Sequence, residues 1–255
     1  MIPIFQSNYS YGKGILTLDK AEEITDDAPI SIFSIAKKHN LKELHLVDYN
    51  FGGFISFYKG CVAAGIKARF GIKFYVCQDL TNKSDDSLKT ESKVVVWALN
   101  SEGYKDLCKL NTESWLPDNF YYQNRLDWPT LKRLWTTNLG LSVDFYDGFL
   151  AQNLIRNGCC VPDLSFTKPE FLVCSCEMPF DTLIENKTVE FCLKNNFPIE
   201  RFHPIYYTND SDAEAFQVFR CIQNKTTTQK PNLEHFSSNK FSFEEYLRKT
   251  VNDNQ

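Results

Sequence analysis

Short apolar runs of strand length alternate with amphipathic segments along most of this chain. The clearest example begins with the apolar run 41–47, which ends in Asp48 and is followed by a glycine-rich turn. Apolar residues then recur at helical spacing over 54–62, Gly65 is a natural helix stop, and residues 66–76 are apolar again. The pattern predicts one βαβ unit. Asp48 stands at the carboxyl end of its first strand, where α/β folds place their chemistry.

The same alternation continues to the end of the chain, which indicates an α/β protein. Further strands are expected at 2–5, 93–99, from 140, at 170–177 and at 204–210, and further helices at 100–111, 128–137, 149–157 and 185–195. Asp26 and Asp27 before Pro29 predict an acidic helix start. Near the end, Ser242 and Glu245 have the spacing of a capping box.

Composition narrows the class of protein. The chain has 255 residues, 43% of them hydrophobic, and a formal net charge of −4 without a long basic run. A large nucleic-acid footprint is therefore not supported, so nucleic-acid binding is expected to be weak or indirect. No apolar run approaches the roughly 18–20 residues that span a bilayer, and the start lacks a signal peptide. Nine cysteines without a CxxC spacing favour reduced thiols in a cytoplasm, with no membrane partner.

Several blocks of the chain carry a family pattern. The sequence is VDYN at 47–50, FYK at 57–59, AGIK at 64–67 and GIKFYV at 71–76. In order and spacing these blocks resemble the PHP (polymerase and histidinol phosphatase) domain that opens the α subunit of bacterial replicative DNA polymerase III. There the pattern is approximately T-D-H-G, F-Y, A-G-I-K and G-C-E-F-Y-V.

Later blocks extend the resemblance over nearly the whole chain. They are SEGYKDLCKL at 101–110, FYYQNRLD at 120–127 and NDSDAEAFQVFRCIQNKT at 209–226. The resemblance implies a distorted (β/α)7 TIM-like barrel of the PHP type over residues 1–225. Residues 226–255 would then form a linker and helix that resemble the exit towards a polymerase palm.

The resemblance also implies a metal site, and most of its ligands are replaced. By register the family's first two histidines fall on Ile4 and Gln6, the histidine after Asp48 is Tyr49, and the glutamate is Lys73. Its later ligands fall on Asp147 and Asp210, and its final histidine is missing. The remnant positions are Gln6, Asp48, Tyr49, Lys73, Asp147 and Asp210. Too few ligands remain for a multinuclear centre, so neither a catalytic residue nor a bound metal is expected.

Lys73 is the most informative replacement. An ammonium beside carboxylates repels a dication by a few kcal/mol at an effective dielectric constant near 20. We therefore hypothesise that Lys73 takes the place of a metal ion and neutralises Asp48 or Asp147. The alternative is an ordinary lysine at a strand end.

Two classes of function follow. The first is a catalytically inactive, protein-binding or scaffold domain in DNA replication, or a mimic of the polymerase surface. Its partner would be a DNA polymerase, a proofreading exonuclease or a clamp component. The second is a phosphoesterase or exonuclease with a remodelled site, holding at most a single divalent cation such as manganese or zinc on Asp48, Asp144, Asp147 and Asp210. The use of Asn, Lys, Phe and Tyr suits an AT-rich genome such as a phage's, in which case the location would be the host cytoplasm.

Overall fold

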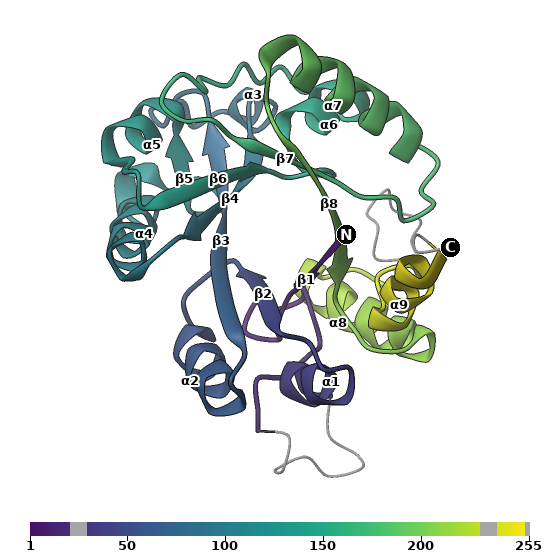
Figure 1. Cartoon of the computed structure of the whole chain (residues 1–255). Helices are drawn as coiled ribbons and strands as arrows, with labels where there is room; N and C mark the ends of the chain where they lie inside the picture. Colours follow the sequence, from purple (N-terminus) through teal and green to yellow (C-terminus); the bar gives the residue numbers. More distant parts are fainter. Residues whose placement is uncertain (21–29, 230–238, 253–255) are drawn as a thin grey trace. The chain divides into compact units, whose positions relative to one another are not determined.

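The computed structural model describes residues 1–20, 30–229 and 239–252, and its strands and helices alternate as expected (Figure 1). The strands are β1 (Ile2–Phe5), β2 (Glu43–Asp48), β3 (Lys67–Cys77), β4 (Ser92–Ala98), β5 (Arg125–Asp127), β6 (Leu139–Val143), β7 (Glu170–Val173) and β8 (Ile199–Ile205). The helices are α1 (Ile32–Lys38), α2 (Phe54–Ala64), α3 (Asp85–Leu88), α4 (Ser101–Ser114), α5 (Trp128–Leu134), α6 (Phe149–Ile155), α7 (Asp181–Asn195), α8 (Ala213–Asn224) and α9 (Phe243–Asn252), with short 3-10 helices η1 (Pro117–Asn119) and η2 (Asp210–Asp212). Among the described residues no helix has the length and apolar character needed to cross a membrane.

The order of strand pairing confirms the expected fold class. The strands are hydrogen-bonded in the order β2-β1-β8-β7-β6-β4-β3-β5, and an additional pairing joins β2 to β3. The circuit from β2 round to β3 is therefore closed, and β5 pairs with β3 outside it. This is the hydrogen bonding of a distorted α/β barrel.

One strand runs against its neighbours, which the hydrophobic pattern did not predict. β4 is antiparallel to both β3 and β6, whereas β1 is parallel to β2 and β8, and β7 is parallel to β6 and β8. The segment between β3 and β4 contains only the single-turn helix α3. An antiparallel neighbour does not need a long crossover connection, so this short segment is sufficient.

The described chain contains two compact units. Unit 1 comprises 1–70, 175–178 and 202–255, and unit 2 comprises 71–174 and 179–201. Each unit has its own core of fully buried side chains, supplied by both strands and helices. These include Phe5, Leu44, Leu46, Phe57 and Phe243 in unit 1 and Ile72, Val94, Val96, Leu141 and Phe171 in unit 2. The described part of the C-terminal segment belongs to unit 1, and a boundary at 225/226 stays a prediction.

The helix ends explain why the local sequence folds as it does. α1 is capped by Ser31, whose hydroxyl accepts the N–H of Phe33, and the acidic cap predicted at Asp26 and Asp27 lies outside the described residues. The predicted stop at Gly65 is confirmed, with a left-handed φ of 65° that favours glycine. The Ser242 hydroxyl accepts the N–H of Glu245 at 3.0 Å, as a capping box requires.

Gly103 in α4 makes a close backbone contact within unit 2. A Cβ built there would lie 2.2 Å from the backbone oxygen of Asn138, which cannot rotate away as a side chain could. We expect Gly103→Ala to lower the free energy of unfolding by about 1–3 kcal/mol, although alanine favours helix by roughly 1 kcal/mol. Chemical denaturation measures this loss. Thr112→Ala, on an exposed turn of the same helix, is the control and should change stability little; an equal effect of both changes would contradict the close approach.

Candidate functional site

The residues singled out from the sequence divide between the two units. Gln6, Asp48, Tyr49 and Asp210 belong to unit 1, and Lys73, Asp144 and Asp147 belong to unit 2. Each group is described by itself below.

Asp48 fastens two segments of unit 1 together. Its fully buried carboxylate accepts hydrogen bonds from the Ser7 N–H at 3.1 Å, the Ser7 hydroxyl at 2.6 Å and the Ser10 hydroxyl at 2.8 Å. The Ser10 oxygen in turn accepts the N–H of Tyr49 at 2.9 Å. Burial raises the pKa of Asp48 to about 6, while the bonds from Ser7 and Ser10 oppose that rise. The carboxylate therefore joins the turn after β1 to the end of β2.

The other N-terminal positions in unit 1 offer little to a cation. Ile4 and Gln6 are buried, and the Gln6 N–H donates to the Ile205 oxygen at 3.1 Å. The ammonium of Lys13 lies over the ring of Tyr49, 5.3 Å from its centroid. The face of the Tyr49 ring thus interacts with the ammonium of Lys13, a cation of the chain itself.

Lys73 on β3 forms a close ion pair within unit 2. Its Nζ lies 2.5 Å from Oδ2 of Asp144, and both side chains are largely buried. The other oxygen of Asp144 accepts the N–H groups of Tyr146 and Asp147 at 3.1 and 3.0 Å, which shapes the turn after β6. The hypothesis named Asp48 or Asp147 as the carboxylate that Lys73 neutralises. The carboxylate in direct contact with Lys73 is Asp144, which the hypothesis did not name, and the charge of Lys73 also favours ionisation of Asp147.

Asp147 is held by further cations of unit 2. Lys93 on β4 lies 2.9 Å from Oδ2, and Arg156 lies 3.4 Å from Oδ1. Burial opposes ionisation of Asp147, but the charges of Lys93, Lys73 and Arg156 outweigh it, so its pKa lies below the ordinary value. The cluster thus contains three cations for the two carboxylates of Asp144 and Asp147.

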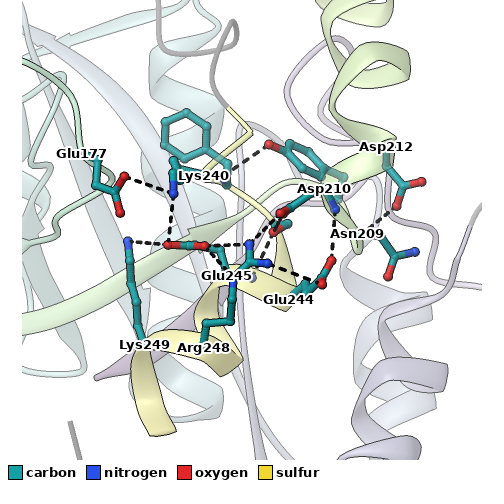
Figure 2. A network of polar contacts seen from close by, with 12 residues as sticks. Glu177, Asn209, Asp210, Asp212, Lys240, Glu244, Glu245, Arg248 and Lys249 are labelled. Atoms are coloured by element: carbon teal, nitrogen blue, oxygen red, sulfur yellow. Dashed lines mark hydrogen bonds and ion pairs between the residues drawn. The ribbon is translucent and has the colours of Figure 1, made fainter. Parts of the chain in front are cut away.

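Asp210 is bound by the C-terminal helix α9, as Figure 2 shows. The guanidinium of Arg248 lies 2.6 Å from Oδ2 of Asp210, and the Ser242 hydroxyl donates to Oδ1 at 2.7 Å. Burial opposes ionisation, and the hydrogen bonds from Arg248 and Ser242 outweigh it, so the pKa of Asp210 is lowered. Arg248 therefore stands where a cation would have to approach this carboxylate.

The same network ties α9 to the rest of unit 1 (Figure 2). The buried carboxylate of Glu245 forms an ion pair with Arg248 at 2.7 Å, and Lys240 forms one with Glu177 at 3.0 Å. Lys249 donates to the backbone oxygen of Ser175. The sequence predicted the cap at Ser242 but not the role of Arg248. The available signal was an arginine one turn after Glu245, which does not point to Asp210.

The donors of the site do not fit the metal centre that the resemblance implies. Within the described ranges, no group of three or more His, Cys, Asp or Glu side chains is placed to hold a metal ion. Position 73 carries a cation, and positions 4 and 6 carry no anionic or imidazole donor. The acidic positions that survive are already engaged by hydroxyls, ammonium groups or guanidinium groups of the chain. Divalent cations need several such donors free to converge.

Comparison with known sequences decides the family. The family model described as the PHP domain matches residues 7–170, which is more than half of the chain. The chain belongs to the PHP domain family. This PHP domain is 28% identical over 240 residues to the DNA polymerase III subunit alpha of Borreliella burgdorferi, a match that covers 88% of the chain. It is 25% identical over 249 residues to the protein of the same name from Treponema pallidum, covering 92% of the chain.

A protein of that name from Helicobacter pylori is 24% identical over 219 residues, covering 78% of this PHP domain. The matches cover 20%, 20% and 18% of the lengths of the Borreliella, Treponema and Helicobacter proteins. The chain thus spans about a fifth of the curated relatives that it matches.

The Lys73–Asp144 pair can be tested by removing one charge at a time. We expect Lys73→Met to lower the free energy of unfolding by about 3–5 kcal/mol, because a largely buried Asp144 would lose its cation. The double change Lys73→Met/Asp144→Asn should recover much of that loss, since asparagine can still accept the two backbone N–H groups. Denaturant unfolding of the parent, the single variant and the double variant gives the three free energies of unfolding.

Lys67→Met is the matched control on the same strand. Its ammonium pairs with Glu43 at 3.1 Å but is 74% exposed, so its loss should cost at most about 1 kcal/mol. Equal costs at Lys67 and Lys73, or a double variant no more stable than Lys73→Met, would show that the buried pair is not an important constraint.

His203 on β8 makes unit 1 sensitive to acid. It is fully buried, and burial, followed by the charge of Lys249, lowers its pKa to about 4. The folded pKa lies below the ordinary value of 6.5, so the unfolded chain takes up a proton before the folded one. The neutral imidazole therefore leaves the stability of the fold intact above pH 6.5, and stability is lost as the pH falls towards 4. At pH 5 the loss is about 2 kcal/mol.

We expect His203→Phe to remove this part of the pH dependence, so that the variant loses about 2 kcal/mol less than the parent between pH 7.5 and 5. Urea unfolding at both pH values measures the difference. His39→Gln, at the partly exposed end of α1, is the control. A His203 variant with an unchanged pH profile would show that this imidazole does not titrate as its burial implies.

Proposed function

We propose that this PHP domain is non-catalytic and works as a protein-binding or scaffold module in DNA replication. The observation that supports the proposal is that groups of the chain itself bind its acidic side chains. Asp48 is bound by Ser7 and Ser10, Asp144 by Lys73, and Asp210 by Arg248. A phosphoesterase would need such carboxylates free to hold an ion that polarises phosphate and activates water.

Electrostatics favour the same conclusion. A dication placed about 4 Å from the ammonium of Lys73 would meet a repulsion on the order of 8 kcal/mol at an effective dielectric constant of 20, twice that of a unit charge. Lys93 and Arg156, which surround Asp147, would add to it. Releasing Asp144 or Asp147 to bind metal would also leave buried cations without their partners.

The link to replication comes from the relatives, which are named as DNA polymerase III subunit alpha. A domain that keeps this fold without its ligands still offers a shaped surface. The proposed partners are a DNA polymerase, a proofreading exonuclease or a clamp component, bound directly or by imitation of the polymerase surface. Nucleic-acid contact would be weak or indirect at a net charge of −4, and the proposed location is the cytoplasm.

A test of catalysis uses the whole chain with manganese or zinc, a nitrophenyl phosphate ester and single-stranded DNA as substrates. We expect no metal-dependent turnover and no rise in the melting temperature with metal, since a ligand that binds only the folded state would raise it. Asp147→Asn provides the comparison. Metal-dependent hydrolysis that is abolished by Asp147→Asn or Asp48→Ala would establish the alternative, a remodelled phosphoesterase or exonuclease.

The binding role is tested separately with purified polymerase III alpha subunit that lacks its own PHP domain, a proofreading exonuclease and a sliding clamp. Calorimetry should detect at least one complex with a dissociation constant in the micromolar range or below. Failure of all three to bind would contradict the replication role even if the chain proved inactive as an enzyme.

A further inference from the structure

A group of exposed aromatic side chains stands on unit 2 between α4 and β5. We call residues 115–122 the aromatic loop. Trp115 is 54% exposed, Phe120 is 45% exposed and Tyr122 is 75% exposed. Large apolar side chains gathered in one short exposed segment mark an interaction site more often than the same side chains scattered singly.

Hydrogen bonds fix the backbone of the aromatic loop. Asn119 is buried and its amide donates to the Glu113 oxygen at 2.8 Å, while the ammonium of Lys83 donates to the backbone oxygens of Asp118 and Phe120 at 2.6 and 2.8 Å. Beneath Tyr121, the guanidinium of fully buried Arg125 lies 5.1 Å from the ring centroid. A surface fixed in this way loses little conformational entropy when a partner binds.

The backbone of Tyr122 is in a strained conformation. Its φ is +57°, a left-handed conformation that bulky residues rarely adopt, yet its ring is the most exposed of the loop's aromatic side chains. The rings of Tyr121 and Tyr122 meet edge to face at 4.6 Å between centroids. A strained residue whose side chain points into solvent contributes little to the core. Such strain is typical of sites retained for binding.

The charges around the aromatic loop select the kind of partner. Asp118 lies within the loop and is exposed, and Asp85 accepts the Tyr121 hydroxyl at 3.1 Å. Of the nearby cations, Lys89 is paired with Asp86 at 2.8 Å, and Lys83 keeps its charge but has its ammonium directed at the backbone oxygens of Asp118 and Phe120. A single-stranded nucleic acid needs aromatic platforms inside a basic groove, which these carboxylates oppose. Arginine or lysine side chains instead stack on aromatic faces and pair with carboxylates.

We propose that the aromatic loop is a docking surface for a protein segment that combines arginine or lysine with apolar residues. Trp115, Phe120 and Tyr122 supply the faces for apolar and guanidinium contacts, and Asp118 and Asp85 supply the countercharge. This inference rests on the proposed protein-binding function and names the surface and the partner chemistry that it would use.

The test uses three labelled probes with the whole chain: a short peptide of alternating leucine and arginine, the same peptide with glutamate, and a short oligothymidylate. Fluorescence anisotropy should show binding of the leucine–arginine peptide alone. Trp115→Ser and Asp118→Lys should each weaken it by at least about tenfold. Leu193→Ser, which removes a 78% exposed side chain from α7 in the same unit, should leave it unchanged. Stronger binding of the glutamate peptide or the oligothymidylate, or no binding by any probe, would overturn the proposal.

Tyr122→Gly gives a readout that does not depend on a damaged fold. Glycine accepts a positive φ without strain, so this variant should melt at a higher temperature while its affinity for the leucine–arginine peptide falls. Unchanged affinity would overturn the docking surface. If a replication protein binds the parent and the Trp115→Ser variant equally, this surface is wrong and the scaffold role stands. If the peptide binds as expected but no replication protein does, the replication role fails and the surface remains.

Discussion

The structure depends on one constraint, that a buried carboxylate must have a partner. A PHP fold places acidic side chains at the ends of its strands, and an intact family site would neutralise them with ions. Here the chain supplies the partners itself, through hydroxyls at Asp48, an ammonium at Asp144 and a guanidinium at Asp210. Desolvation would make the buried carboxylates of Asp48 and Asp144 strongly destabilising if their partners were removed, and the 30% exposed Asp210 less so.

This replacement changes what the acidic residues contribute. At Asp48 the carboxylate orders the turn after β1, and at Asp144 it orders the turn after β6. Both are structural roles, and at Asp48 the role falls on a position where the resemblance implies a metal site. A lysine or arginine also fixes its carboxylate in one geometry through directed hydrogen bonds, whereas a metal ion would draw several ligands to one point. The acidic residues can therefore persist in the sequence after their ligand partners have been replaced.

The C-terminal helix gains importance from the same constraint. Arg248 reaches Asp210 and Glu245, and Lys240 and Lys249 add contacts to the segment 175–178 (Figure 2). α9 is thereby part of unit 1, although its sequence resembles a segment that leaves the domain. The aromatic loop of unit 2 differs, because its exposed rings and strained tyrosine lower the stability of the fold. The proposed interaction with a partner accounts for their presence.

The sequence by itself determined the local structure and the family. Periodicity located most strands and helices, and Gly65 and Ser242 predicted their helix ends. The resemblance carried by blocks such as GIKFYV implied the barrel fold. It also revealed the loss of ligands at Tyr49 and Lys73, since a change of residue type needs no coordinates. These features depend on neighbours in sequence, and local propensity and capping act over a few residues.

Only the tertiary structure decided which charges meet. Lys73 contacts Asp144 directly and its charge also acts on Asp147, and Arg248 reaches Asp210 from a helix 38 positions away. The reversed direction of β4 and the exposure of Tyr122 were equally invisible in the pattern of apolar residues. The physical reason is that ion pairing and burial depend on distances between segments remote in sequence, and no periodicity encodes those distances.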